Sequence, residues 1–173
     1  METKDVVSGV GTFFAIVLGV YNYLYARKND RVQLQVTPQV ATRLANSNGE
    51  ADGYRYTQNR SEVTPNARDA QLFAINVVNV GKFAITLNEV GLMKRGQQPR
   101  FTFRDATDLG GNVLPRRLEP REDVTLHFKI SALRGVPELT RATRAYAHTA
   151  CGEFRYGNSA ALRELADSDA NAG

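Results

Sequence analysis

Residues 72–92 read LFAINVVNVGKFAITLNEVGL, and this stretch decides the fold class. In its first half every second residue is large and apolar, as a half-buried β-strand requires: Phe73, Ile75 and Val77. The tripeptide Asn79-Val80-Gly81 then favours a turn. The alternation resumes after it with Phe83, Ile85 and Leu87. The sequence therefore predicts two strands joined by a short turn.

The second of these strands continues with a change of phase. Val90 and Leu92 fall one residue out of step with the preceding run, which predicts a β-bulge near Asn88-Glu89. A first strand is expected to begin at Val32 and to end at Pro38. Other runs typical of strands occupy residues 101–103, 124–130, 143–150 and 153–156.

Turn and cap signals complete the domain at its C-terminal end. Cys151-Gly152 suits a tight hairpin between the last two strands. Ser159 is expected to cap a short helix that ends at Leu165. Residues 167–173 are expected to form a disordered tail, so the folded domain is predicted to span residues 32–166.

A long polar stretch interrupts this domain between residues 39 and 70. It is rich in Asn, Arg, Ser and Gly, and its only aromatic residues are Tyr54 and Tyr56. A loop of this length is unusual inside a compact domain. We expect either a functional loop, with a short strand around Tyr54–Thr57, or an inserted segment.

Short strands at spacings near ten residues, with turn signals between them, predict a mainly β fold. The expected architecture is an immunoglobulin-like β-sandwich with a short C-terminal helix. The chain has no tryptophan and a single cysteine, Cys151, so the Cys…Trp…Cys core of antibody domains is absent. A lone cysteine also excludes a disulfide within the chain and suits a reducing compartment.

An uncharged segment, residues 6–26, precedes this domain and reads VVSGVGTFFAIVLGVYNYLYA. As an α-helix it is about 31 Å long, which matches a hydrocarbon layer of about 30 Å. Its Leu, Ile, Val and Phe side chains favour insertion, while its glycines, Ser8 and Asn22 oppose it. We expect a transmembrane helix preceded by a short flank, residues 1–5.

Three other interpretations of this segment fit less well. A cleaved signal peptide needs a basic start and small residues at the cleavage site, whereas this chain begins with Glu2, Lys4 and Asp5. A buried core helix is rarely this long without any charge. A pilin-like N-terminus needs a basic leader and an acidic residue early in the helix, and the sequence has neither.

The C-terminal end of the segment carries residues typical of a membrane interface. Three aromatic rings are expected at headgroup level: Tyr21, Tyr23 and Tyr25. Three basic residues follow in the flank formed by residues 27–31: Arg27, Lys28 and Arg31. Because Lys4 alone precedes the helix, the positive-inside rule places the N-terminus outside and the domain inside. We expect a single-pass protein of the inner, or cytoplasmic, membrane with a cytoplasmic domain.

One face of the segment carries small residues at intervals of four: Gly11, Ala15 and Gly19. Such spacing lets two helix backbones approach closely in lipid. It predicts a homo-oligomer formed through this helix, or pairing with another membrane helix. Small residues are also common in membrane helices that do not pair, so this alternative stays open.

Three motifs carry a resemblance to a known group of proteins: LFAINVVNVGKFAITLNEVGL at 72–92, LPRRLEPREDVTLHF at 114–128 and CGEFRYGNS at 151–159. Together with the apolar segment and its basic flank, they resemble uncharacterised bacterial and prophage single-pass membrane proteins with an immunoglobulin-like domain. Arg121 stands where that group often has glycine. The resemblance covers residues 6–36 and 71–160, and it implies an architecture and a bacterial or phage origin without known enzymatic activity.

Residues that could carry chemistry are few. His127, His148 and Cys151 are candidate metal ligands, but structural zinc needs four ligands from tighter motifs. His127 is expected on the outward face of its strand, and both histidines are expected to be solvated. Cys151 at a hairpin has no evident base beside it. We therefore expect no enzymatic activity, no metal and no cofactor.

The net charge of +4 is modest, and the arginines are interspersed with acidic residues. No basic helix or aromatic-plus-basic strand motif accompanies them, which argues against nucleic-acid binding. The sequence predicts a membrane-anchored, non-enzymatic module that binds an unidentified protein partner through a strand edge or the 39–70 loop. Two alternatives stay open: a structural subunit of a membrane or phage envelope assembly, and a ligand-binding domain in the periplasm or exterior.

Overall fold

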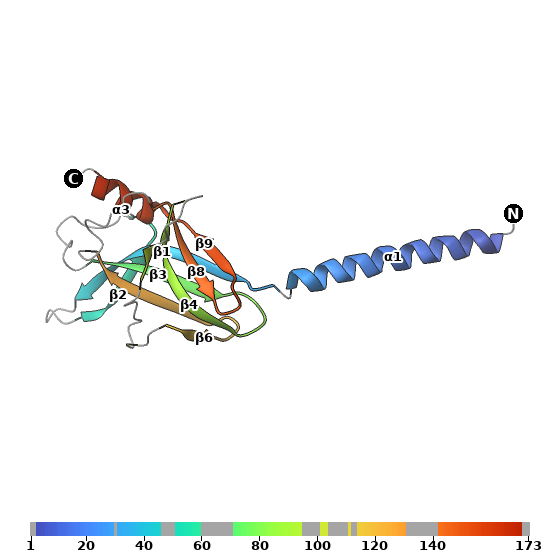
Figure 1. The fold of residues 1–173 in the computed structure, drawn as a ribbon, viewed down its shortest axis with the longest axis horizontal. Coiled ribbons are helices and arrows are strands. Elements are labelled where there is room, and N and C mark those ends of the chain that lie inside the picture. The colour runs from blue at the N-terminus through green and yellow to red at the C-terminus, as the bar shows by residue number, and fades with distance from the viewer. Residues whose placement is uncertain are drawn as a thin grey trace. The chain divides into compact units, whose positions relative to one another are not determined.

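The computed structural model describes residues 3–29, 31–45, 51–59, 71–94, 101–103, 111, 114–130 and 142–170. The chain divides into two compact units, Met1–Val32 and Gln33–Gly173. The first unit holds a long helix, and the second holds the described strands and a short helix (Figure 1). The second unit begins one residue after the domain boundary predicted at residue 32.

Helix α1 spans Thr3–Asn29 and is longer than the uncharged run from which it was predicted. It takes in charged residues at both of its ends. Charged residues are unfavourable in the interior of a bilayer. They are compatible with a helix, because Lys and Arg have good helix propensity. The helix therefore includes most of the flank predicted at residues 27–31, and Arg31 lies in a bend after it.

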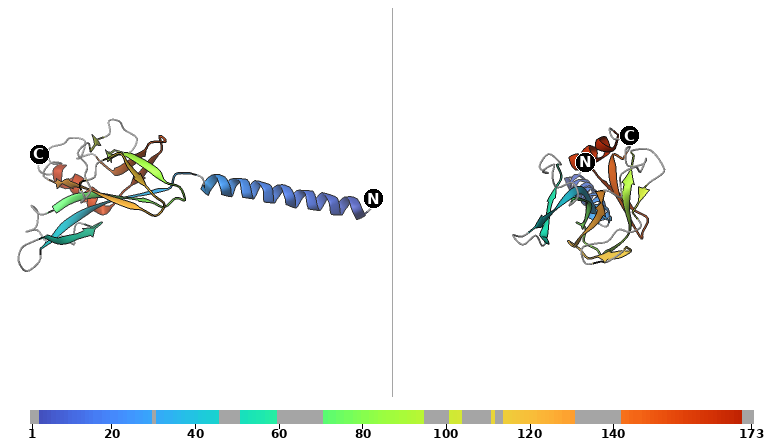
Figure 2. Two further views of the ribbon diagram at one scale, coloured as in Figure 1. Left: turned by 90° about the horizontal axis from the view of Figure 1, so that it is seen from below. Right: turned by 90° about the vertical axis from the view of Figure 1, so that its left-hand side faces the viewer.

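The second unit contains two antiparallel sheets, which Figure 2 shows from two further directions. The first sheet has the order β2-β1-β3-β7, with β1 (Leu34–Ala45), β2 (Ala51–Thr57), β3 (Gln71–Asn79) and β7 (Asp123–Lys129). The second has the order β5-β4-β8-β9, with β4 (Ile85–Met93), β5 (Phe101–Thr102), β8 (Arg144–Thr149) and β9 (Phe154–Gly157). Strand β6 (Arg116–Leu118) also pairs with β4. The predicted mainly β fold is confirmed.

The two sheets share an apolar core. In the first sheet, alternate residues of β3 and β7 point into it: Phe73, Ile75, Val77, Val124, Leu126 and Phe128. Phe128 stacks on Phe103 beyond β5, with ring centroids 3.8 Å apart. Gly157 of β9 lies so close to β1 that an added Cβ would be 1.7 Å from the Val36 carbonyl oxygen. These contacts hold the sheets together in a sandwich-like arrangement.

Two local predictions for the second sheet are confirmed. The register between β4 and β8 shifts between Leu87 and Glu89, at the predicted bulge. The hairpin between β8 and β9 turns at residues 150–152, where Gly152 has φ +83°. This is the left-handed region that favours glycine, because a side chain is strained there.

Strand β1 corrects the prediction for its region. The strand was expected to end at Pro38, but it continues to Ala45. Pro38 lies opposite Ile75 of β3, whereas pairing with β2 begins only at Val40. Proline has no N–H, but the missing group of Pro38 would face β2 where the two strands are not yet paired. No ladder hydrogen bond is therefore lost, and the strand tolerates the proline.

The 39–70 stretch is accordingly less of a loop than the sequence predicted. Its first part belongs to β1, and residues 51–57 form β2, an edge strand. This includes the short strand that was expected around Tyr54–Thr57. The polar composition of both strands hid the hairpin, because neither alternates clearly in hydropathy. Residues 60–70 lie outside the described residues.

Helix α3 spans Ala160–Ala170 and begins after the predicted cap. The Ser159 hydroxyl accepts a hydrogen bond from the Leu162 amide at 3.2 Å. One face of the helix is buried, on Ala161, Leu162, Leu165 and Ala166.

This helix extends beyond its predicted end at Leu165. The disordered tail expected at 167–173 was therefore wrong for residues 167–170, which are helical. A helix can continue through polar residues once its buried face has been docked. Residues 171–173 lie outside the described residues.

Asn79, the last residue of β3, is fully buried and joins two turns. Its backbone N–H donates a hydrogen bond to the Glu122 carbonyl at 2.9 Å, and its backbone C=O accepts one from the backbone N–H of Arg121 at 2.8 Å. Its side-chain Nδ2 donates to the Phe83 carbonyl at 2.8 Å and to the Leu118 carbonyl at 3.1 Å. This one residue therefore binds the β3–β4 turn to the β6–β7 turn.

Two further contacts fix the same turns. The Asn79 Oδ1 accepts from the Gly81 amide at 3.0 Å, which closes the β3–β4 turn. The Glu122 carboxylate accepts from the Glu119 amide at 2.8 Å and pairs with Arg116 at 3.1 Å. The backbone hydrogen bond from Glu119, followed by the one from Arg116, lowers the pKa of Glu122.

The variant Asn79→Ala should be strongly destabilised. It leaves buried carbonyl groups without their donor, and each such group costs roughly 1–3 kcal/mol. We expect the free energy of unfolding to fall by about 2–4 kcal/mol, measured by denaturant unfolding of the full chain in detergent. The exposed Asn88 in the β4 bulge provides the control, and Asn88→Ala should stay within about 0.5 kcal/mol of wild type. Equal stabilities of the two variants would contradict the role of Asn79.

Candidate functional site

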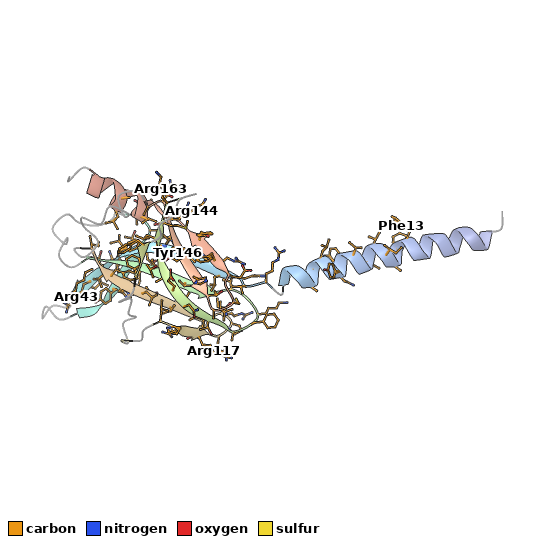
Figure 3. All side chains as sticks on the ribbon, in the orientation of Figure 1. Phe13, Arg43, Arg117, Arg144, Tyr146 and Arg163 are labelled. Atoms are coloured by element: carbon orange, nitrogen blue, oxygen red, sulfur yellow. The ribbon has the colours of Figure 1, made fainter. Side chains whose placement is uncertain are left out.

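The described side chains of α1 are those of residues 13–26, and all of them are exposed. Figure 3 labels one of the large ones, Phe13, on α1. Large side chains occupy most of these positions, so the helical period places them on every side of the helix: Phe13, Phe14, Ile16, Val17, Leu18, Val20, Tyr21, Tyr23, Leu24 and Tyr25. Within the part of the chain that the structure describes, no helix is both long enough and apolar enough to cross a membrane.

The predicted membrane-interface residues surround the C-terminal part of α1. Tyr21 and Tyr25 lie one turn apart with stacked rings, 6.2 Å between centroids. Tyr23 lies on the other side of the helix, as the helical period requires. The side chains of Arg27 and Lys28 lie outside the described residues, and Arg31 is exposed in the bend that follows. Their role at a membrane stays a prediction.

The small residues Gly11, Ala15 and Gly19 share one stripe of α1, because residues four apart lie one above another on a helix. Ala15 and Gly19 are exposed. A Cβ added at Gly19 would meet nothing within 4 Å. The surroundings of Gly11 lie outside the described residues. The stripe is therefore open at two of its three positions, and its pairing with a second helix stays a prediction.

An aromatic cluster covers the outer face of the first sheet. Tyr54 and Tyr56 of the edge strand β2 reach across two strands to His127 of β7. The Tyr56 hydroxyl lies 3.0 Å from His127 Nε2, and the Tyr54 and His127 ring centroids are 5.5 Å apart. The intervening strands contribute Ala41 and Ala74, which face outward yet are fully buried. Small side chains at these two positions let the tyrosines lie across the sheet.

This cluster corrects the prediction that His127 is solvated. The imidazole is half-buried and contacts both tyrosines. The sequence could not reveal the contact, because 71 residues separate Tyr56 from His127 and the strand order was unknown. Burial, then the neighbouring Tyr54 and Asp123, raises the pKa of Tyr56 above its ordinary value of 10.0.

A second aromatic row lies on the outer face of the second sheet. His148 stacks on Phe154 with ring centroids 4.2 Å apart, so this histidine is not simply solvated either. Phe154 in turn lies 6.4 Å from Tyr156, and Tyr156 is 48% exposed. The row pairs residues of β8 and β9 directly across the hairpin. Its exposed end offers an aromatic surface to solvent.

The candidate metal ligands are distributed over different parts of the unit. His127 lies on the first sheet, and His148 lies on the second. Cys151 is exposed in the β8–β9 turn, with its Sγ 3.1 Å from the Thr149 hydroxyl. Across the described residues, no group of three His, Cys, Asp or Glu side chains is suited to hold a metal ion.

A polar cluster links β4, β5 and β8. The fully buried Tyr146 donates a short hydrogen bond from its hydroxyl to Glu89 Oε1. The Thr102 hydroxyl donates to the same oxygen at 2.9 Å and lies 2.9 Å from the Tyr146 hydroxyl. Gly91 makes room for this arrangement, since an added Cβ would lie 2.8 Å from the Tyr146 oxygen. Because all three polar groups satisfy one another, we assign the cluster a structural role.

Comparisons of the chain with protein families, curated proteins and solved structures found no match. Among the described residues the chain presents three kinds of surface: the exposed apolar side chains of α1, the edge strand β2 with its tyrosines, and the exposed turns of the second unit.

The variant Tyr56→Phe should weaken the dependence of the protein's stability on pH in the alkaline range. The folded protein holds the Tyr56 proton more tightly than the unfolded chain, because its pKa is raised. The resulting stability is complete below pH about 10 and is lost as the pH rises through the folded-state pKa. We expect the melting temperature of the wild type to fall more steeply above this pH than that of Tyr56→Phe. A Tyr56→Phe variant that keeps the wild-type slope would contradict the assignment.

Proposed function

We propose that this chain is a membrane-anchored, non-enzymatic protein-interaction module of bacterial or phage origin. Its second unit would be an immunoglobulin-like β-sandwich on the cytoplasmic face of the inner membrane. One observation carries the proposal. A helix whose described side chains are all exposed, and many of them large and apolar, directly precedes a unit with its own core.

The energy of exposed apolar surface supports the anchor. A large apolar side chain contributes roughly 1.5–3 kcal/mol when it leaves water, and α1 forgoes this contribution at each exposed position. A bilayer supplies the missing apolar environment along the whole helix. The uncharged run from Val6 to Ala26 extends beyond residues 13–26, the described side chains, and reaches the length of a hydrocarbon layer.

The strand orders support the immunoglobulin-like part of the proposal. The first sheet contains β1-β3-β7 in adjacent positions, and the second contains β4-β8-β9. With β2 left out of the count, these orders match the A-B-E and C-F-G strands of immunoglobulin-like sandwiches, although β6, which stands in the place of strand D, pairs with β4. Strand β2 then adds to the free edge of the first sheet, beside β1.

The edge of β2 is the surface that we propose for the protein partner. An edge strand presents N–H and C=O groups to which another chain can add. Tyr56 and Leu44 are exposed near it, with fractions of 39% and 40%. Arg43 and Arg55 are exposed on the same two strands. Tyrosine and arginine are the residues that protein interfaces favour.

The anchor and its orientation can be tested together. Membranes from cells that express the full chain are washed with alkaline carbonate, which releases peripheral proteins but not membrane-spanning ones. We expect the chain to stay in the pellet, because residues 6–26 span the bilayer. Of two reporters fused to the C-terminus, the one that is active only in the cytoplasm should give a signal, and the one that is active only outside should not. Release by carbonate would refute the anchor, and a reporter active outside would instead favour the exterior ligand-binding alternative.

A structural subunit that assembles through α1 is the second candidate, and the open stripe at Ala15 and Gly19 favours it. Replacing Gly11, Ala15 and Gly19 by Leu should separate the oligomer into monomers, because the larger side chains keep two helix backbones apart. Cross-linking in native membranes measures the change.

The matched control for this prediction replaces residues on another face of the helix. The variant Phe13→Leu with Val17→Ile changes exposed apolar side chains on the face opposite the small stripe. It should leave the cross-linked species intact. An oligomer that survives the triple replacement would contradict helix pairing through this face.

A further inference from the structure

Two turns of the second unit meet beside the residue at which that unit begins. The β3–β4 turn, residues 80–84, is bonded to the start of the unit, since the Val80 amide donates to the Gln33 carbonyl at 3.0 Å. The β6–β7 turn, residues 119–122, is held next to it by the hydrogen bonds of Asn79. The polypeptide that arrives from Val32 therefore enters the unit beside an ordered turn.

The β8–β9 turn, residues 150–153, lies at the same end. The Ala150 amide donates to the Thr86 carbonyl at 2.9 Å, near the start of β4. We call the three turns together the Asn79 end. Strand β1 runs from this end to the opposite one, where Leu44 is exposed about 33 Å away along an extended strand.

The Asn79 end carries an ordered apolar tip. Val80 and Phe83 are 49% and 58% exposed, which makes them the most exposed large apolar side chains described in this unit. They do not lie in a loose loop, because Asn79 binds both the Gly81 amide and the Phe83 carbonyl. Apolar side chains that are held out into solvent by a rigid turn mark an interaction surface.

Basic and acidic side chains both lie near this tip, and two of the basic ones stand outside any ion pair among the described residues. Lys82 lies between the two apolar residues, and Arg121 lies on the adjacent turn. The neighbouring Arg116 and Arg117 are each paired with a glutamate, at 3.1 and 2.8 Å. Among the described residues, Lys82 and Arg121 have no such ion pair. Arg121 also has φ +67°, a conformation that favours glycine, so an arginine is present where the backbone would prefer no side chain.

We propose that the Asn79 end is a lipid-contacting surface that rests on the bilayer in which α1 is anchored. Val80 and Phe83 enter the interfacial layer, and Lys82 and Arg121 contact the phosphates of anionic lipids. The inference depends on the proposed membrane anchor and goes beyond it, because a tethered domain does not have to touch the membrane. It would give the tethered unit a defined face toward the lipid.

The chemistry and the position of the tip both favour a bilayer as its occupant. In the sequence only residues 30–32 lie between the end of α1 and Gln33, the residue at which the chain enters the unit at its Asn79 end. An apolar tip with basic residues around it matches an interface of acyl chains and anionic headgroups. Arg31, two residues before Gln33 in the sequence, is a further exposed basic residue.

The single cysteine provides the probe for a test. Cys151 is exposed in the β8–β9 turn of the Asn79 end, and it is the only cysteine in the chain. The full chain, labelled there with a fluorophore, is reconstituted into vesicles of phosphatidylcholine with phosphatidylserine. Nitroxide groups on the lipid headgroups quench only a fluorophore that lies near the bilayer surface. We expect strong quenching for the wild type.

Variants identify the residues responsible. Val80→Ser with Phe83→Ser should lose most of the quenching, and Lys82→Glu with Arg121→Glu should lose it on anionic vesicles. The matched controls change residues at the opposite end of β1. Leu44→Ser and Arg43→Glu should quench as the wild type does. Thermal unfolding of each variant verifies that a loss of quenching does not reflect a loss of fold.

The outcomes separate this inference from the proposed function. A chain that carbonate releases from the vesicles has no membrane anchor, and both proposals then fail. A chain that resists carbonate but shows no quenching in its wild-type form keeps its anchor and overturns the lipid-contacting surface alone. Equal quenching in all four variants would likewise overturn the assignment to these residues. Quenching lost only in the two variants of the Asn79 end supports it.

Discussion

The buried side chain of Asn79 is the constraint on which the order of the second unit depends. It lies at the point where β3 ends, and its amide group is hydrogen-bonded to carbonyl groups of two different turns. Burial without these partners would be unfavourable, so the turns and the asparagine stabilise one another. The same contacts determine where the chain enters the unit and which side chains are exposed there. Packing of the apolar strands alone would leave those turns undefined.

Much of the fold could be predicted from local patterns. The strands on both sides of Asn79, the bulge after Leu87, the β8–β9 hairpin and the cap at Ser159 all follow from residues close together in the sequence. The hairpin of β1 and β2 could not be predicted, because its polar side chains conceal the period of a strand. Strand order was equally out of reach, since it depends on pairings between residues far apart.

The candidate surfaces could likewise be predicted only where they depend on residues close together in the sequence. A role of α1 in a membrane could be proposed from an uncharged run and its flanks, because a bilayer selects for length and hydropathy. The cluster of Tyr54, Tyr56 and His127 depends on the strand order, and on two alanines whose small size matters only once the strands are adjacent. The exposure of Phe83 contradicts the sequence pattern itself, in which Phe83 alternates with Ile85 and Leu87 as a residue of the next strand.

Hydrogen exchange of the full chain in lipid nanodiscs tests the central claim, that α1 is a membrane anchor, most directly. In water the amides of an isolated helix with exposed side chains exchange quickly, because its hydrogen bonds open readily. If residues 13–26 lie within the bilayer, their amides should stay protected as long as those of the core strands β3 and β7. Rapid exchange of residues 13–26, while β3 and β7 remain protected in the same sample, would contradict the account.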